Sequence, residues 1–313
     1  MNLMVAGGAG FLGSNLCEQL LNLGHKVVAV DNLITGSQKN IDYLLQFKNF
    51  TFINHDIIEF RTFDVDGIFN LACPASPPLY QKDPVGTVKT NVIGSTNLLE
   101  LARKTNSRIL QASTSEIYGD PKISPQTEEY WGNVNPIGLR SCYDEGKRTA
   151  ETLFMDFHRQ YGTDIRIARI FNTYGPRMAI NDGRVVSNFI VQSLTNNDLT
   201  IYGNGEQIRS FCFVDDLIDG LIKLFFKNDC HQPLNLGNPD PITMENLAME
   251  IVKLTKSNSK ISNLPLPSDD PVNRIPDISK AIEQLNWKPV INRSEGLKKT
   301  INYFAQELKI VFS

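Results

Sequence analysis

The chain has 313 residues, of which 41% are hydrophobic and 21% charged, and its formal net charge at pH 7 is −3. This composition is that of an ordinary globular protein with a sizeable core. The slightly acidic balance gives no electrostatic reason to expect a nucleic acid or an anionic membrane as a partner. No stretch approaches the ~18 apolar residues of a membrane span, and the N-terminus lacks the pattern of a signal peptide. We therefore expect a soluble, cytoplasmic protein.

The five cysteines are widely spaced and include no Cys-x-x-Cys pair. This pattern indicates neither a disulfide framework nor a zinc site, so no metal is expected. Three cysteines lie in apolar stretches and are predicted to be small core residues, namely Cys17, Cys73 and Cys212.

Strand-like and helix-like segments alternate in the first half of the chain. Runs rich in Val, Ile and Phe predict strands over 2–7, 25–31, 50–56, 67–72, 108–113 and 164–170. Apolar residues at i, i+3 and i+4 predict helices over 15–23, 85–103 and 147–161. Because the strands are apolar on both faces, the alternation predicts an α/β fold, a doubly wound parallel sheet with helices on both sides.

After about residue 172 the pattern loosens, and proline and glycine become frequent. A helix near 214–227 and a strand over 233–237 are predicted to return to the sheet. We expect a larger domain of 1–172 plus about 214–237, and a smaller, discontinuous C-terminal lobe of about 173–213 plus 238–313. The lobe would lie over the carboxyl ends of the strands, where open α/β sheets bind ligands.

A glycine-rich turn follows the first predicted strand, with Gly7, Gly10 and Gly13 in the spacing G-x-x-G-x-x-G. Such a turn at a helix N-terminus lets the backbone approach a pyrophosphate and indicates a Rossmann-type dinucleotide site. Asp31 ends the second predicted strand and is followed by Asn32 rather than an arginine. A carboxylate there suits a ribose 2′-hydroxyl and repels a 2′-phosphate, so NAD is preferred over NADP. The alternatives are tight packing without a nucleotide for the glycines and a plain turn cap for Asp31.

Other loop residues are expected to complete the NAD site. Asp56 and Ile57 follow the third predicted strand, where they would meet the adenine. The remaining residues expected at the cofactor are Phe11, Leu12, Thr35, Gly36 and Leu71.

Tyr143 and Lys147 are four residues apart in a predicted helix and therefore share one face. A tyrosine has an ordinary pKa of about 10, and a nearby ammonium and an oxidised nicotinamide would bring its pKa toward the working range of a base. The alternative is an exposed pair on a solvated helix. Thr114 and Glu116 follow the fifth predicted strand and would lie at the same edge of the sheet, which favours catalysis.

These features resemble the extended short-chain dehydrogenase/reductase family that acts on nucleotide sugars. The residues that carry the resemblance are the glycine turn, Asp31, "STSEIYG" and Tyr143-x-x-x-Lys147. It continues in "ARIFNTYGPR", "TIYGNGEQIRSF", "DDLIDGL" and "LNLGNP", and so covers essentially the whole chain. Within the family, the UDP-glucuronate decarboxylases, which form UDP-xylose, are most similar in "ACPASPP", "YWGNVNPIG", "CYDEGKR", "DGRVVSNFI" and "RIPDISKA".

The resemblance implies decarboxylation of UDP-glucuronate through a 4-keto intermediate on one tightly held NAD that is reduced and reoxidised in each turnover. Tyr143 would take the proton of the sugar 4-hydroxyl, and Thr114 would bond the 4-oxygen. Lys147 would hold the nicotinamide ribose and tune Tyr143. Because the 4-ketone lies beta to the C5 carboxylate, the electrons left by CO2 can move into an enolate.

The resemblance also assigns roles to Glu116 and Arg274. Glu116 would face the C5 substituent, the alternative being a carboxylate bonded to backbone N–H groups at the strand end. The related 4,6-dehydratases carry an Asp at the position of Ser115, so elimination of a C6 hydroxyl is disfavoured here. Arg274 would lie at the sugar and orient a water, because a guanidinium is effectively never deprotonated. The alternative is a surface arginine near Asp269 and Asp270.

Further residues are expected at the UDP part of the substrate, namely Asn172, Arg209 and Tyr202, with Lys89 as a weaker candidate. Tyr202 could instead be a core aromatic. Trp131 and Trp287 are predicted to be packing residues. The helices near 85–104 and 143–162 resemble those that form the family's dimer interface, so a homodimer is expected.

Three other functions stay open. The first is a UDP-sugar 4-epimerase, and the second is an oxidative decarboxylase that releases UDP-4-keto-pentose together with NADH. The third is a non-catalytic NAD-binding sensor, which would be expected to lack Thr114 or the Tyr143-x-x-x-Lys147 pair, and both are present.

Overall fold

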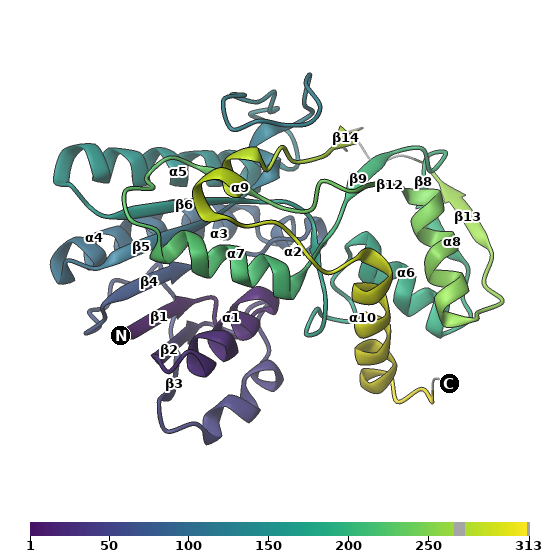
Figure 1. Cartoon of the computed structure of the whole chain (residues 1–313), viewed down its shortest axis with the longest axis horizontal. Coiled ribbons are helices and arrows are strands. Elements are labelled where there is room, and N and C mark those ends of the chain that lie inside the picture. The colour runs from purple at the N-terminus through teal and green to yellow at the C-terminus, as the bar shows by residue number, and fades with distance from the viewer. Residues whose placement is uncertain (266–272, 312–313) are drawn as a thin grey trace.

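The structure, a computed structural model, describes residues 1–265 and 273–311. Its centre is a seven-stranded sheet in the order β11-β6-β5-β4-β1-β2-β3, with every neighbouring pair parallel (Figure 1). The predicted doubly wound parallel sheet is confirmed. Its strands are β1 (Asn2–Ala6), β2 (Lys26–Asp31), β3 (Phe50–Asn54), β4 (Gly67–Asn70), β5 (Arg108–Thr114), β6 (Ile165–Ile170) and β11 (Leu234–Leu236).

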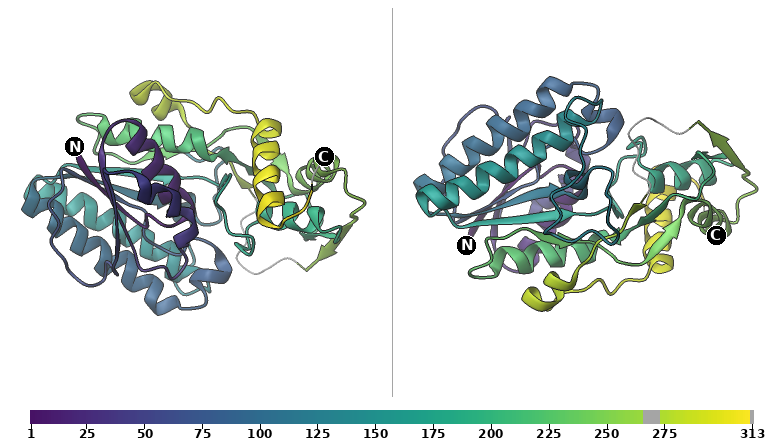
Figure 2. Two further views of the ribbon diagram at one scale, coloured as in Figure 1. Left: turned by 90° about the horizontal axis from the view of Figure 1, so that it is seen from below. Right: turned by 90° about the horizontal axis from the view of Figure 1, so that it is seen from above.

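Helices cover both faces of this sheet (Figure 2). On one face lie α1 (Phe11–Asn22) and α7 (Val214–Phe226), and on the other α4 (Ser95–Thr105) and α5 (Ser141–Tyr161). The central strand β1 shows the consequence, because Leu3 and Val5 belong to the core with α1 and α7, whereas Met4 and Ala6 belong to the core with α4 and α5. Burial on both faces explains why the strands carry no polar alternation.

The helix predicted over 85–103 is interrupted. After α2 (Pro77–Tyr80), the chain forms α3 (Pro84–Lys89), a wide π turn over Thr90–Gly94 and then α4. At Gly94 a Cβ atom would lie only 2.5 Å from Ile57 Cδ1, so a glycine allows this turn to pack closely. Such turns inside helices occur frequently at functional sites.

The smaller lobe is built from α6 (Val185–Leu194), α8 (Met244–Thr255), α10 (Arg293–Glu307) and short strands (Figure 1). The strands pair as β7 (Thr173–Tyr174) with β10 (Cys212–Phe213), and β8 (Leu199–Tyr202) with β13 (Ile261–Leu264). A third group is β12 (Pro241–Thr243), β9 (Ile208–Ser210) and β14 (Asn273–Arg274). One apolar core runs from α7 into this lobe, since Leu217 belongs to the same cluster as Phe189, Leu247 and Phe304.

One segment of the predicted lobe range 238–313 packs on the large sheet instead. Helix α9 (Ser279–Leu285) contacts α7 and β11. Trp287, which is 1% exposed, anchors it by donating from Nε1 to the Asp216 carbonyl oxygen at 3.0 Å. Trp287 is therefore a packing residue as predicted, but the same prediction for Trp131 is wrong because its side chain is 88% exposed. Across the described residues, no helix is long and apolar enough to cross a membrane.

Candidate active site

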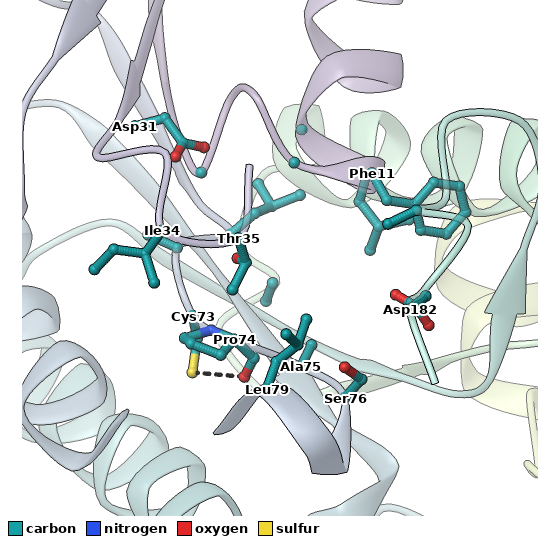
Figure 3. A pocket seen from close by; sticks show the side chains of 18 of the residues that line it. Phe11, Asp31, Ile34, Thr35, Cys73, Pro74, Ala75, Ser76, Leu79 and Asp182 are labelled. Carbon is teal, nitrogen blue, oxygen red and sulfur yellow. Dashed lines mark hydrogen bonds between the residues drawn. The ribbon is translucent and has the colours of Figure 1, made fainter. Parts of the chain in front are cut away.

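A cavity of about 740 Å³ lies between the carboxyl ends of the sheet strands and the smaller lobe. Figure 3 shows Phe11 and Asp182 toward one end of it and Asp31 and Ile34 toward the other. Most residues predicted for cofactor and sugar line this one cavity, although they come from distant parts of the chain. They are Gly7, Gly10, Phe11, Leu12, Asp31, Asn32, Thr35, Asp56, Ile57, Leu71, Thr114, Glu116, Tyr143, Lys147, Asn172 and Arg274.

The glycine turn has the geometry that a dinucleotide pyrophosphate requires. Gly7 has φ +77°, and a Cβ atom on Gly13 would lie 2.0 Å from the Gly7 carbonyl oxygen, so neither position tolerates a side chain. Helix α1 begins after Gly10, and in the described part of the chain no side chain caps it and no acidic residue occupies its first turn. Its first N–H groups are thus left for an anion in the cavity.

Asp31 is fixed at the end of β2 by its own surroundings. Its two carboxylate oxygens accept backbone N–H groups at 2.8 and 3.0 Å. A Cβ atom on Gly36 would lie 2.8 Å from this carboxylate, so Gly36 supports Asp31 and is not itself part of the cavity wall. Next to it, Asn32 Nδ2 donates to Asp56 Oδ2 at 2.9 Å. A fixed carboxylate at this position fits the ribose hydroxyls of NAD.

Tyr143 and Lys147 lie together on the cavity side of α5, and they are only 6% and 3% exposed. The alternative of a solvated surface pair is therefore wrong. Lys147 Nζ donates to the Ala112 carbonyl oxygen at 2.9 Å and lies 5.8 Å from the centre of the Tyr143 ring. Thr114 is hydrogen-bonded to the Tyr143 hydroxyl. The Tyr80 ring stacks on Tyr143 with centroids 5.0 Å apart, which fixes the plane of the phenol.

The pKa of Tyr143 is raised, whereas a nearby ammonium and an oxidised nicotinamide were expected from the sequence to lower it. Burial raises it above the ordinary 10, with the negative charge of Glu116 adding to the effect, while the hydrogen bond with Thr114 lowers it. Burial also lowers the pKa of Lys147. The protein residues alone thus keep Tyr143 protonated, because desolvation of the phenolate and the negative charge of Glu116 outweigh the hydrogen bond with Thr114.

Cys73 lies in the cavity wall and is only partly buried, so its prediction as a core residue is wrong, whereas Cys17 and Cys212 are buried as predicted. The Cys73 sulfur accepts from Asn91 Nδ2 at 3.2 Å, and the same amide group also donates to the Thr87 carbonyl oxygen at 3.1 Å. The π turn therefore places a polar side chain beneath the cavity.

Glu116 lies among charged side chains rather than against the backbone. Its carboxylate pairs with Arg140 Nη2 at 2.6 Å and with Arg274 Nη1 at 3.3 Å. Burial raises the pKa of Glu116, but the two guanidinium groups outweigh it and lower this pKa to about 2. Arg274 is 7% exposed, so the surface alternative is wrong, and its supposed neighbours Asp269 and Asp270 lie outside the described residues.

Several charged residues at or near the cavity, Arg140, Asp144 and Arg184 among them, were not predicted from the sequence as site residues. In "RSCYDEGK", Arg140 precedes Tyr143 by three residues and Asp144 follows it directly, and both contact Glu116. Arg184 lies across from the glycine turn, with its guanidinium 5.8 Å from the Phe11 ring centre and paired with Asp182. Arg184 could have been predicted, because it lies in "DGRVVSNFI", one of the segments that resemble the decarboxylases, although no role was assigned to it there.

Three predicted substrate residues are not among the described residues that line the cavity. Arg209 is 7% exposed on β9 and faces Arg274 in register. Tyr202 is 47% exposed at the end of β8, so the alternative of a core aromatic is wrong. Lys89 is exposed at the end of α3. Their contacts with a substrate stay predictions.

Known proteins resemble this chain over nearly its full length. UDP-glucuronic acid decarboxylase 1 of Xenopus tropicalis is 52% identical over 98% of this chain and 73% of its own length. UDP-glucuronic acid decarboxylase 3 of Arabidopsis thaliana is 54% identical over 95% of this chain and 87% of its own. The crystal structure of UDP-glucuronic acid 4-epimerase from Bacillus cereus, with UDP-glucuronic acid and NAD, matches with a TM-score of 0.88 at 28% identity, covering 98% of this chain and all of the other.

A family model matches residues 3–237, a segment that contains the glycine turn, Asp31, Thr114, Tyr143 and Lys147. These are the residues that the cavity brings together. The chain belongs to the NAD-dependent epimerase/dehydratase family.

Proposed function

We propose that the protein is an NAD-dependent UDP-glucuronate decarboxylase that forms UDP-xylose through a 4-keto intermediate. The main support is the combination of Glu116 and Arg274 with Thr114, Tyr143 and Lys147 in one cavity, in a chain about half identical to decarboxylases over most of its length. NAD, when bound, supplies a hydride acceptor at C4 and then returns the hydride.

The residues of this chain would divide the remaining work. Tyr143 is held by the Tyr80 ring and the Thr114 hydroxyl. The positive charge of an oxidised nicotinamide nearby would favour its phenolate, which would accept the proton of the sugar 4-hydroxyl and later return it. Thr114 would donate to the 4-oxygen as negative charge develops there during loss of CO2. Lys147, fixed by the Ala112 carbonyl, would place its ammonium beneath the nicotinamide ribose.

The pair Ser115–Glu116 favours decarboxylation over dehydration. Elimination of water across C5 and C6 requires an acid at the leaving hydroxyl and a base at C5. Ser115 is no acid, and Glu116 is clamped as an anion by two arginines. Loss of CO2 from a β-keto acid requires no acid at the leaving group, which this arrangement suits.

A 4-epimerase is the second candidate, because a structural relative with that activity was solved with UDP-glucuronic acid. Incubation of the protein with UDP-glucuronate, with CO2, NADH and sugar products measured together, separates the possibilities. We expect CO2 and UDP-xylose with no net NADH. A C4 epimer without CO2 would refute the proposal, and CO2 with stoichiometric NADH would indicate release of UDP-4-keto-pentose.

We also propose a homodimer formed through α3, α4 and α5. Support comes from apolar side chains exposed on the first of these helices and the turn after it, with Val85, Val88 and Ile93 exposed by 64%, 40% and 43%. Burial of such side chains in a helical interface is favourable. Sedimentation at micromolar concentration should show a dimer, and a monomer would contradict the proposal.

A cytoplasmic location is proposed from the free thiols of all five cysteines, and cell fractionation tests it.

A further inference from the structure

Among the described residues, Glu116 belongs to a cluster at the end of β5 that includes Arg140, Asp144 and Arg274. Arg140 and Asp144 come from the start of α5, and Arg274 comes from β14 of the smaller lobe. Arg140 and Arg274 lie 2.6 and 3.3 Å from Glu116, and the side chain of Asp144 is hydrogen-bonded to Glu116. The Glu116 side chain is 12% exposed, so water contributes little to its solvation.

A hydrogen bond between two carboxyl groups requires one proton, because two carboxylates offer only acceptors. Both arginines pair with Glu116, so the anion is at Glu116 and the proton belongs on Asp144. Asp144 is 7% exposed, and its Oδ1 is buried without a partner among the hydrogen bonds of the described residues. An unpartnered buried oxygen is far less costly on a neutral carboxyl group than on a carboxylate.

Other titratable groups face the same space. Tyr80 and Tyr143 lie close enough to interact electrostatically with Asp144, and Cys142 precedes it by two residues. Burial, followed by the negative charge of Glu116, raises the pKa of Asp144 to about 8, while the nearby arginines lower it. The carboxyl group is therefore neutral at pH 7.

The backbone connects this cluster to the base. The Arg140 carbonyl oxygen accepts the N–H groups of both Tyr143 and Asp144, at 2.9 and 3.0 Å. The first turn of α5 thus carries both Tyr143 and Asp144, and the Arg140 side chain donates to Glu116 from the start of the same turn. A shift of this turn would move the base and the carboxylate together.

We propose that Asp144 is a positioning residue that, as a neutral carboxyl group, donates a hydrogen bond to Glu116 and with Arg140 fixes the direction of the Glu116 carboxylate in the cavity. The consequence for the reaction rests on the proposed function. When Asp144 loses its proton at alkaline pH, Glu116 loses a donor and gains a repelling charge. The carboxylate then turns away from the sugar, so kcat falls while the KM for UDP-glucuronate changes little.

The first test uses the ligand-free protein and does not depend on its activity. Infrared difference spectra at pH 7 compare the wild type with Asp144→Asn. We expect loss of one protonated-carboxyl absorption. The control is Asp156→Asn, the same change at an exposed position of the same helix, which should lose none. An unchanged carboxyl absorption in Asp144→Asn would overturn the inference.

The second test follows decarboxylation against pH. The amide introduced by Asp144→Asn would keep a donor to Glu116 but cannot titrate. This variant should therefore keep kcat within about threefold of wild type at pH 7 and lose the decline of kcat above pH 8. Asp144→Ala should lower kcat at pH 7 at least tenfold with KM changed less than threefold. An alkaline decline that persists in Asp144→Asn would overturn the positioning role. Absence of CO2 release by the wild type would refute the proposed function instead, and the infrared result would still decide the protonation of Asp144.

Discussion

The protonated Asp144 should make the stability of the protein depend on pH in an unusual direction. In the native protein its pKa is raised from the ordinary 3.8 to about 8, so it keeps its proton across the neutral range. In the unfolded chain the same group is ionised above about pH 5. The native state therefore binds one more proton than the unfolded state between pH 5 and pH 7, and stability falls as pH rises through this window.

The magnitude follows from one proton over two pH units. Each pH unit changes the free energy of unfolding by about 1.4 kcal/mol for one proton. The ionisation equilibrium of Asp144 alone should therefore lower the free energy of unfolding by about 3 kcal/mol when the pH is raised from 5 to 7. For a chain of 313 residues this corresponds to about 4–5 °C in Tm. Glu116 does not interfere, because its lowered pKa stabilises the fold above 4.5 and this contribution is lost only as pH falls toward 2.

The assay is thermal unfolding at pH 5, 6 and 7, followed by far-UV circular dichroism. The Tm of Asp144→Asn minus that of the wild type should rise by about 4–5 °C from pH 5 to pH 7, because the amide has no proton to lose. The exposed Asp156→Asn variant should run parallel to the wild type. If the Asp144→Asn and wild-type curves are also parallel, the carboxyl group is not protonated in the native state and the reasoning is wrong.

Three further predictions test other parts of the site. Glu116→Gln should lower kcat on the order of a hundredfold while the Kd for NAD, measured by calorimetry, stays within about threefold. Gly13→Ala would bring a methyl group to 2.0 Å from the Gly7 carbonyl oxygen, so NAD binding should be lost in the same titration, and retained affinity would contradict the turn geometry. Trp287→Phe removes the 3.0 Å hydrogen bond to the Asp216 carbonyl and should cost about 1–3 kcal/mol in denaturant unfolding, whereas no loss would mean that the ring alone anchors α9.

The sheet and the cofactor edge of the cavity could be predicted because local patterns determine them. Strands buried on both faces are continuous apolar runs, and a turn that excludes side chains leaves glycines at fixed spacing. Gly7, Gly13 and Asp31 are therefore visible in the sequence itself. The break in the helix over 85–103 was not visible, since the close packing of Gly94 on Ile57 depends on a residue distant in sequence.

The partners of Glu116 show why the rest of the site could not be predicted. Arg140 and Asp144 are ordinary polar residues near a helix start, and such residues are usually solvated. Their role depends on β5 and α5 meeting at one point and on β14 arriving from the smaller lobe with Arg274. Conversely, Trp131 in an aromatic segment was predicted to pack, yet its side chain is 88% exposed while its backbone carbonyl accepts from Arg148.

The ion pairs of Glu116 with Arg140 and Arg274 also limit the ability of this carboxylate to take up a proton. The two arginines hold the pKa of Glu116 far below neutral, so taking up a proton at pH 7 is costly for this carboxylate. Such a cost would remove most of the advantage of a general base, so Glu116 is suited to act as a fixed charge rather than as a proton carrier. Tyr143 is then the group of the cavity placed to exchange protons with the sugar, at the 4-oxygen. A proton delivered to C5 after loss of CO2 would have to come from water. The Glu116 carboxylate, which Arg140 and Asp144 hold in place, is positioned to orient that water molecule.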